Sequence, residues 1–177
     1  LLEAMQEGTI SAAGQSLPLP RPFFVLATQN PIEMEGTYSL PEAQIDRFLF
    51  RVDVDYPDTD VLSGILAATT GSTIATPDQT VKPEDILALQ ALVRAVPIAE
   101  PLRRAVAALS IASQPGAPGA SDEVRRNLRF GLSPRGAQSL VLAAKAHALI
   151  SGRAHVAVED LRAMLHPASC HRVQANF

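Results

Sequence analysis

The feature that most limits the fold is an apolar run of five residues, Phe23-Phe24-Val25-Leu26-Ala27, which ends in the polar stretch Thr28-Gln29-Asn30-Pro31. The run is too short for an ordinary helix, and Pro22 bounds it on the other side. It therefore predicts a β-strand buried on both faces, which is typical of a parallel sheet. Polar residues at the carboxyl end of such a strand lie where open α/β sheets bind ligands.

A second polar tip is predicted after a loop that contains Gly36. Pro41 opens a short predicted helix, Glu42 to Asp46, and a second predicted strand runs from Phe48 to Val54. Asp46 and Arg47 lie between the two elements. The pattern indicates that Thr28 to Pro31 and Asp46-Arg47 both face something outside the sheet.

The continuous stretch ATQNPIEMEGTYSLPEAQIDRF closely resembles the MoxR family of AAA+ ATPases, and the resemblance extends from Leu1 to about Arg172. It implies that Asn30 is the sensor 1 residue, which positions the attacking water on its own subunit's nucleotide. It also implies that Arg47 is an arginine finger that reaches the ATP of a neighbouring subunit. From the residues alone, Asn30 also fits a plain Asn-Pro turn and Arg47 a surface ion pair.

Arg135 is the candidate with the strongest local argument. Ser133 is a good N-cap and Pro134 a good first residue, so a helix is predicted to begin there. A cation next to that helix start costs about 0.3–1 kcal/mol, unless a bound anion removes the conflict. The stretch GLSPRG resembles the family's sensor 2 motif, usually G-[small]-S-P-R-A, which implies that Arg135 binds the γ-phosphate in its own subunit. A solvated arginine is the alternative.

Composition limits the remaining classes. The net charge of −3, without a basic block, argues against a dedicated nucleic-acid surface. Cys170 is the single cysteine and suits a reducing cytoplasm. No apolar run approaches the ~18 residues of a membrane span. His166, Cys170 and His171 are interpreted as structural, because no fourth metal ligand is near them in the sequence.

The predicted fold is mainly α. Residues 1–56 are expected to form part of an α/β AAA+ core of the P-loop NTPase type, with a hairpin around Gly14, the sensor 1 strand and the arginine-finger segment. Tyr56-Pro57 marks a boundary, and helical periodicity after it predicts an all-α bundle over 57–177 that corresponds to the AAA+ lid domain.

Within this predicted bundle, Asp58 and Ser121 are expected to cap helices, and Lys82-Pro83 is expected to begin another.

Two motifs of the family are missing from the sequence. It contains no G-x-x-x-x-G-K-[ST] and no apolar strand that ends in Asp-Glu; in the family these Walker A and Walker B segments lie N-terminal of LLEAMQE. The resemblance implies a cytoplasmic parent protein that binds ATP and Mg²⁺, hydrolyses ATP in a hexameric ring and remodels client proteins. The alternative is a non-catalytic helical interaction module, and the residues encoded upstream of Leu1 would discriminate the two.

We predict that the 177-residue chain by itself does not hydrolyse ATP. Sensor and finger residues refine a phosphate site, but they do not replace the P-loop lysine and the Mg²⁺ ligand. Release of inorganic phosphate by the purified chain should equal the buffer background, and turnover above that background would contradict the prediction.

Overall fold

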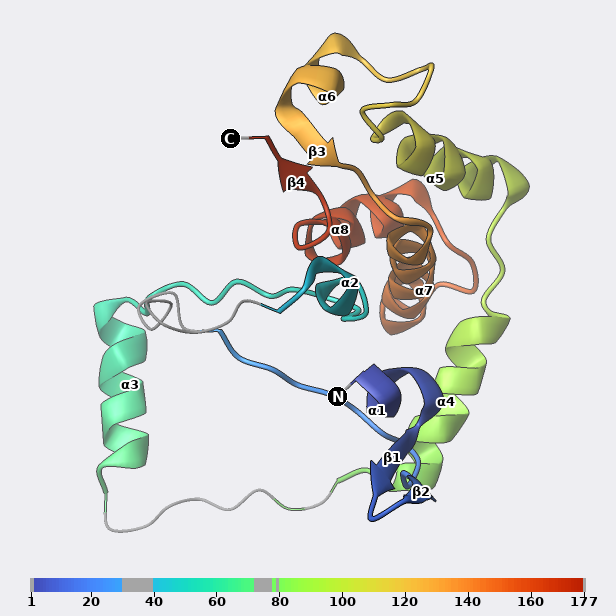
Figure 1. Ribbon diagram of the computed structural model, residues 1–177. Coiled ribbons are helices and arrows are strands. Elements are labelled where there is room, and N and C mark those ends of the chain that lie inside the picture. Colours follow the sequence, from blue (N-terminus) through green and yellow to red (C-terminus); the bar gives the residue numbers. More distant parts are fainter. Residues whose placement is uncertain (1, 30–39, 72–77, 79, 177) are drawn as a thin grey trace.

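The fold is mainly helical, as predicted, and its elements are labelled in Figure 1. The computed structural model describes residues 2–29, 40–71, 78 and 80–176. Asn30 and most of the loop after it lie outside the described residues, so the predicted sensor 1 position has no structural account here. The helices of the C-terminal part form a bundle, and the N-terminal part consists of short elements joined by extended segments.

The bundle is built around α7 (Pro134–Ile150), which packs against α4 (Pro83–Ala95), α5 (Glu100–Ala112) and α8 (Val158–Ser169). The predicted starts at Lys82-Pro83 and Ser133-Pro134 are confirmed. Small side chains on α7 let the neighbouring helices approach closely, since Ala144 and Ala148 are completely buried. Two apolar clusters form the core, and their buried members are Val96, Ala144 and Val156 in one and Val106, Leu140 and Ala168 in the other.

A buried carboxylate joins the end of α7 to the start of α8. Asp160 is completely buried, and it contacts His147 Nδ1 at 2.6 Å, the Arg153 guanidinium and the Ala157 backbone N–H at 2.8 Å. Burial raises the pKa of Asp160, but these hydrogen bonds outweigh burial, so the pKa is lowered overall. The carboxylate therefore stays charged and stabilises the turn between the two helices.

The predicted hairpin is also confirmed. Helix α1 (Leu2–Glu7) precedes β1 (Thr9–Ala12) and β2 (Gln15–Pro18), which pair antiparallel through a two-residue turn. Both turn residues have positive φ, 50° at Ala13 and 78° at Gly14, which matches the right-handed twist of a hairpin. A second small sheet, β3 (Leu128–Phe130) with β4 (Gln174–Ala175), follows α6 (Asp122–Asn127) and was not predicted.

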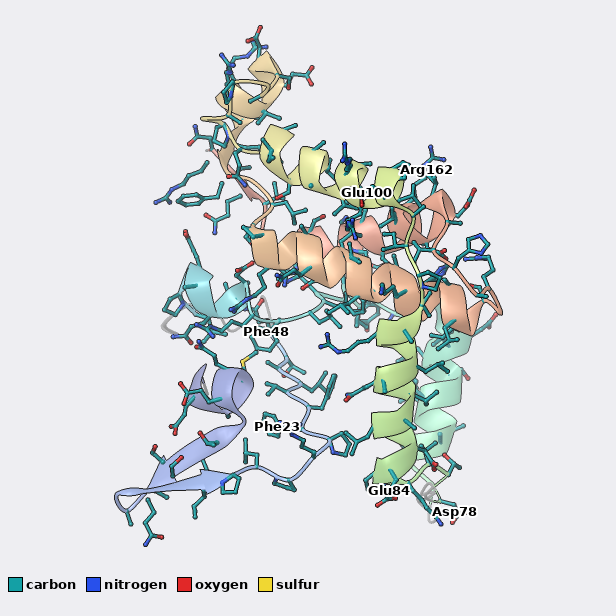
Figure 2. The ribbon with its side chains drawn as sticks, turned by 90° about the vertical axis from the view of Figure 1, so that its right-hand side faces the viewer. Phe23, Phe48, Asp78, Glu84, Glu100 and Arg162 are labelled. Carbon is teal, nitrogen blue, oxygen red and sulfur yellow. The ribbon has the colours of Figure 1, made fainter. Side chains whose placement is uncertain are left out.

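Two predicted strands are not formed. The segments Phe23–Ala27 and Phe48–Val54 have no regular structure, and Figure 2 marks Phe23 and Phe48 on them. Their apolar side chains are open to solvent, with Leu26 82% and Val54 90% exposed. A strand needs a hydrogen-bonded neighbour, and the only sheets in the described part of the chain are the two small ones above. The prediction of two strands is therefore wrong for these segments, because no described strand pairs with either of them.

The first helix after the boundary lies outside the bundle. Helix α3 (Thr59–Thr69) is capped by Asp58 as predicted, yet Figure 1 shows it apart from the other helices. Its apolar stripe remains exposed, including Val61 at 54% and Leu66 at 52%. The bundle therefore begins with α4 rather than with α3. None of the described helices is both long and apolar enough to cross a membrane.

We propose that the chain divides near Tyr56-Pro57 into a less stable N-terminal part and a helical part whose compact bundle begins at α4. Backbone amides of Phe23–Gln29 lack a ladder, whereas those of α7 are bonded within a buried helix. In a hydrogen-exchange experiment, the amides of Phe23–Gln29 should exchange more than about a hundredfold faster than those of α7. Equal protection of both segments would contradict this division.

Candidate functional site

A buried arginine near the C-terminus joins the N-terminal part to the bundle. The side chain of Arg172 is 1% exposed, and its Nε donates to Asp46 Oδ1 at 2.9 Å. Its Nη2 donates to the backbone carbonyls of Asp46 at 2.9 Å and Phe48 at 2.6 Å. The guanidinium therefore holds the segment that follows helix α2 (Glu42–Ile45).

The same guanidinium also bonds to the bundle. Arg172 donates to Ser139 Oγ on α7 at 3.1 Å and to the Ala168 carbonyl on α8. Burial lowers the pKa of Arg172, and the hydrogen bond that Arg172 donates to Asp46 offsets only part of that effect. The group remains a cation at neutral pH, because the pKa of a guanidinium group ordinarily lies far above neutrality. Asp46, the sequence neighbour of Arg47, is therefore the counter-ion of Arg172.

Asp46 links the two arginines predicted to be functional. Its Oδ1 also accepts a hydrogen bond from Ser133 Oγ at 2.6 Å. Ser133 is the N-cap of α7, as predicted, and accepts from the Gly136 N–H at 2.9 Å. Arg47 follows Asp46 in the chain and Arg135 follows Ser133 by two residues. One short hydrogen-bonded connection thus fixes where both arginine backbones lie.

Arg47 and Arg135 line a common pocket of about 420 Å³. Its walls come from α1, the end of α2, the last turn of α4 and one face of α7, and the lining residues are Met5, Gln6, Arg47, Arg94, Arg135, Gln138, Ser139 and Leu142. Figure 1 shows these four helices around the same region. The sequence predicted Arg47 and Arg135 separately; the fold brings them together.

The pocket is strongly positive. Three of its eight lining residues are arginines and none is acidic. Arg47 Nη1 donates to Gln6 Oε1 at 2.6 Å, while its buried Nε has no partner among the described residues. The described carboxylates form no ion pair with these three arginines. Such a donor set fits phosphate oxygens, and without a carboxylate it does not fit a Mg²⁺ ion.

Two departures from the usual sensor 2 motif compensate each other. Leu132 replaces a small residue and is 2% exposed. Gly136 replaces alanine, and a Cβ there would lie 2.5 Å from Leu132 Cδ1 and 2.7 Å from Arg172 Cδ. The larger side chain at 132 fills the space that the missing methyl group at 136 leaves. Leu132 and Gly136 therefore fit each other at the start of α7.

His166, Cys170 and His171, which the sequence analysis interpreted as structural, do not form one group in the structure. Asp53, His166 and Cys170 each offer one ligand atom within 4.8 Å of the others. His171 instead lies 3.0 Å from the Phe48 carbonyl, and burial lowers its pKa, so it is neutral near pH 7. Asp53 is already paired with Arg51 at 2.9 Å. We assign no metal site to this solvent-exposed group.

Several residues of the site were not predicted. Arg172 was seen only as the end of the family resemblance, and Arg94 only as part of a helix. A single sequence carries little signal for them, because arginine is common on helix surfaces and near helix ends. A weak signal did exist for Arg94, since Arg94 and Gln90 are the two polar residues in the apolar run from Ile86 to Val96.

Comparisons with known proteins first define the class. Residues 1–50 match the model of the ATPase family associated with various cellular activities (AAA), and residues 121–177 match an AAA lid domain. The chain is thus an AAA+ core segment with its lid, which confirms the predicted fold class.

Similar proteins then define the family. The chaperone MoxR1 of Mycobacterium tuberculosis is 36% identical over 100% of the chain, and the protein MoxR of Paracoccus denitrificans is 37% identical over 98%. A crystal structure from Cytophaga hutchinsonii, provisionally named an ATPase, is 31% identical with a TM-score of 0.88 over 99% of the chain. The chain belongs to the MoxR family of AAA+ ATPases. It spans about half the length of these proteins, covering 47%, 54% and 54% of them respectively.

The Arg172 connection yields a stability prediction. Arg172→Lys keeps the charge but replaces the planar fork of donors by one ammonium group, so the bonds to Asp46 and Phe48 cannot all form. The free energy of unfolding should fall by about 2 kcal/mol in urea denaturation. Arg162→Lys, on an exposed position of α8, is the control and should be neutral. Equal stability of both variants would show that the network does not stabilise the chain.

Proposed function

We propose that this chain supplies phosphate-binding arginines to a MoxR-type AAA+ ATPase, which hydrolyses ATP in a ring and remodels partner proteins. The observation that carries the proposal is the pocket that Arg47 and Arg135 line together and whose lining includes no acidic residue. The family membership supports nucleotide use, and the chaperone name of one relative supports a role on other proteins. A cytoplasmic location is part of the same proposal.

In this proposal, the two arginines bind the phosphate chain of a nucleotide. Guanidinium groups neutralise charge that develops on a transferring phosphoryl group, and their planar donors fix its orientation. Arg135, at the second position of α7, adds its charge where the helix start already favours an anion. Asn30 is proposed to orient the attacking water, on the strength of the motif alone.

The shared pocket favours one nucleotide for both arginines. The family resemblance suggested a division, with Arg47 acting on the neighbour's ATP and Arg135 on its own subunit's ATP. Two side chains that line one pocket of about 420 Å³ in a single chain are better placed to bind the same phosphates. We therefore propose that whichever nucleotide Arg47 reaches, Arg135 reaches as well, and that the neighbour's nucleotide is the one.

This pocket also distinguishes the proposal from a non-catalytic interaction module. Three arginines line this one pocket without a carboxylate, and an anion bound among them would offset the repulsion between their like charges. A surface that only binds a protein partner would not require that arrangement. We therefore favour the ATPase over the interaction module.

Mixed rings of the protein that carries this chain with its Walker segments test the shared nucleotide. Arg47→Ala and Arg135→Ala should each lower kcat strongly, because a trans arginine finger contributes about 10³–10⁵ in related phosphoryl transfer. A mixture of the two variants should stay inactive, since every arginine-donating subunit lacks one of the pair.

The control is a mixture of Asn30→Ala with Arg47→Ala. There, some interfaces join an intact nucleotide side to an intact donor, so activity should partly return. Recovery in the first mixture would assign the arginines to different nucleotides. Full activity of both single variants would contradict the proposed function itself.

A further inference from the structure

We propose that Arg94 is a third phosphate-binding arginine of the same pocket. No motif of the family resemblance includes this residue, and only its place in the fold draws attention to it. The inference rests on the proposed function, because it names a further contact to the nucleotide that Arg47 and Arg135 bind.

The position of Arg94 follows from how α4 meets α7. Lys145 Nζ on α7 donates to the Arg94 carbonyl at 2.9 Å, which fixes the last turn of α4 against α7. The α7 residues that line the pocket follow an i, i+3, i+4, i+7 spacing and so share one face of the helix; they are Arg135, Gln138, Ser139 and Leu142. Arg94 closes the end of this face opposite to Arg135.

The place of Arg94 at the end of α4 explains why the residue is basic, but it does not explain why its side chain lines the pocket. The last turn of a helix stabilises a cation, so α4 favours a basic residue there. That effect does not require the side chain to line a pocket with two other guanidinium groups. Elsewhere in the described chain, the neighbouring arginines Arg103 and Arg104 both form ion pairs with Glu100. Arg94 forms no such ion pair with a described carboxylate.

The chemistry of the pocket identifies its ligand class. Three guanidinium groups and the amide of Gln138 surround about 420 Å³, with no carboxylate to neutralise them. A single phosphate needs fewer donors, whereas a triphosphate carries several charged oxygens along its length. Arg135 and Arg94 lie at opposite ends of the α7 face, which suits an extended polyanion. We therefore assign Arg94 to the triphosphate chain of ATP.

The test compares Arg94→Ala with Arg162→Ala in the full-length protein. Arg162 is an exposed arginine of α8 that does not line the pocket, and Figure 2 shows it away from the α4–α7 junction. Two quantities are measured: the Kd of a non-hydrolysable ATP analogue by calorimetry, and kcat/KM for ATP. Arg94→Ala should raise the Kd and lower kcat/KM, each by about tenfold or more, as expected for a lost charge-assisted hydrogen bond. Arg162→Ala should leave both quantities unchanged.

Arg94→Lys separates a ligand contact from a packing role. Lysine keeps the charge, so it should restore most of the affinity that Arg94→Ala loses, with the melting temperature the same in all three variants. If Arg94→Ala matches Arg162→Ala while Arg47→Ala and Arg135→Ala are inactive, the assignment of Arg94 is wrong and the proposed function stands. If Arg47→Ala and Arg135→Ala also bind and hydrolyse normally, the proposed function fails and Arg94 with it.

Discussion

The hydrogen bonds of the buried Arg172 guanidinium hold this structure together. The extended segment around Asp46 has no sheet to belong to in the described chain, and its apolar neighbours are open to solvent. Arg172 compensates by donating to Asp46, Phe48 and Leu49 on that segment and to Ser139 and Ala168 on the bundle. A buried charge is tolerated only when it is paired and fully hydrogen-bonded, and the burial of Arg172 meets that condition. Without Arg172, the segment after α2 would lose most of its hydrogen bonds to the bundle, although those between Ser133 and Asp46 and between His171 and Phe48 would remain.

The same connection gives the lid a direct effect on the proposed arginine finger. Asp46 accepts from both Arg172 and Ser133, and Ser133 caps the helix that carries Arg135. A displacement of α7 or α8 would therefore move Asp46, and Arg47 with it. The two arginines are placed by one hydrogen-bonded unit rather than by two independent domains. Gly136 belongs to this unit too, because a methyl group there would collide with Arg172 and Leu132.

Sequence patterns predicted the helices well where their signals are local. Caps at Asp58, Ser121 and Ser133, and Pro83 at the first position of α4, were all identified from the sequence, because capping depends on residues within one turn. The strands over Phe23–Ala27 and Phe48–Val54 were predicted from equally clear apolar runs and are not formed. A strand depends on a partner distant in sequence, and a local pattern cannot report whether that partner is present. Helix α3 shows the same limit, because its apolar stripe predicted a buried face but did not show which element would cover that face.

The sequence by itself determined the family and the identity of Asn30, Arg47 and Arg135 as candidates, since motif residues follow one another in a fixed order along the chain. Only the tertiary structure decided that Arg47 and Arg135 line one pocket, that Asp46 serves Arg172 rather than Arg47, and that Arg94 joins them. The physical reason is the separation of the partners in the sequence. Asp46 is 87 positions from Ser133 and 126 positions from Arg172, and it forms hydrogen bonds with both. Residues so far apart in the sequence become neighbours only when the bundle packs. The sequence around each of them does not show which distant residue it will contact.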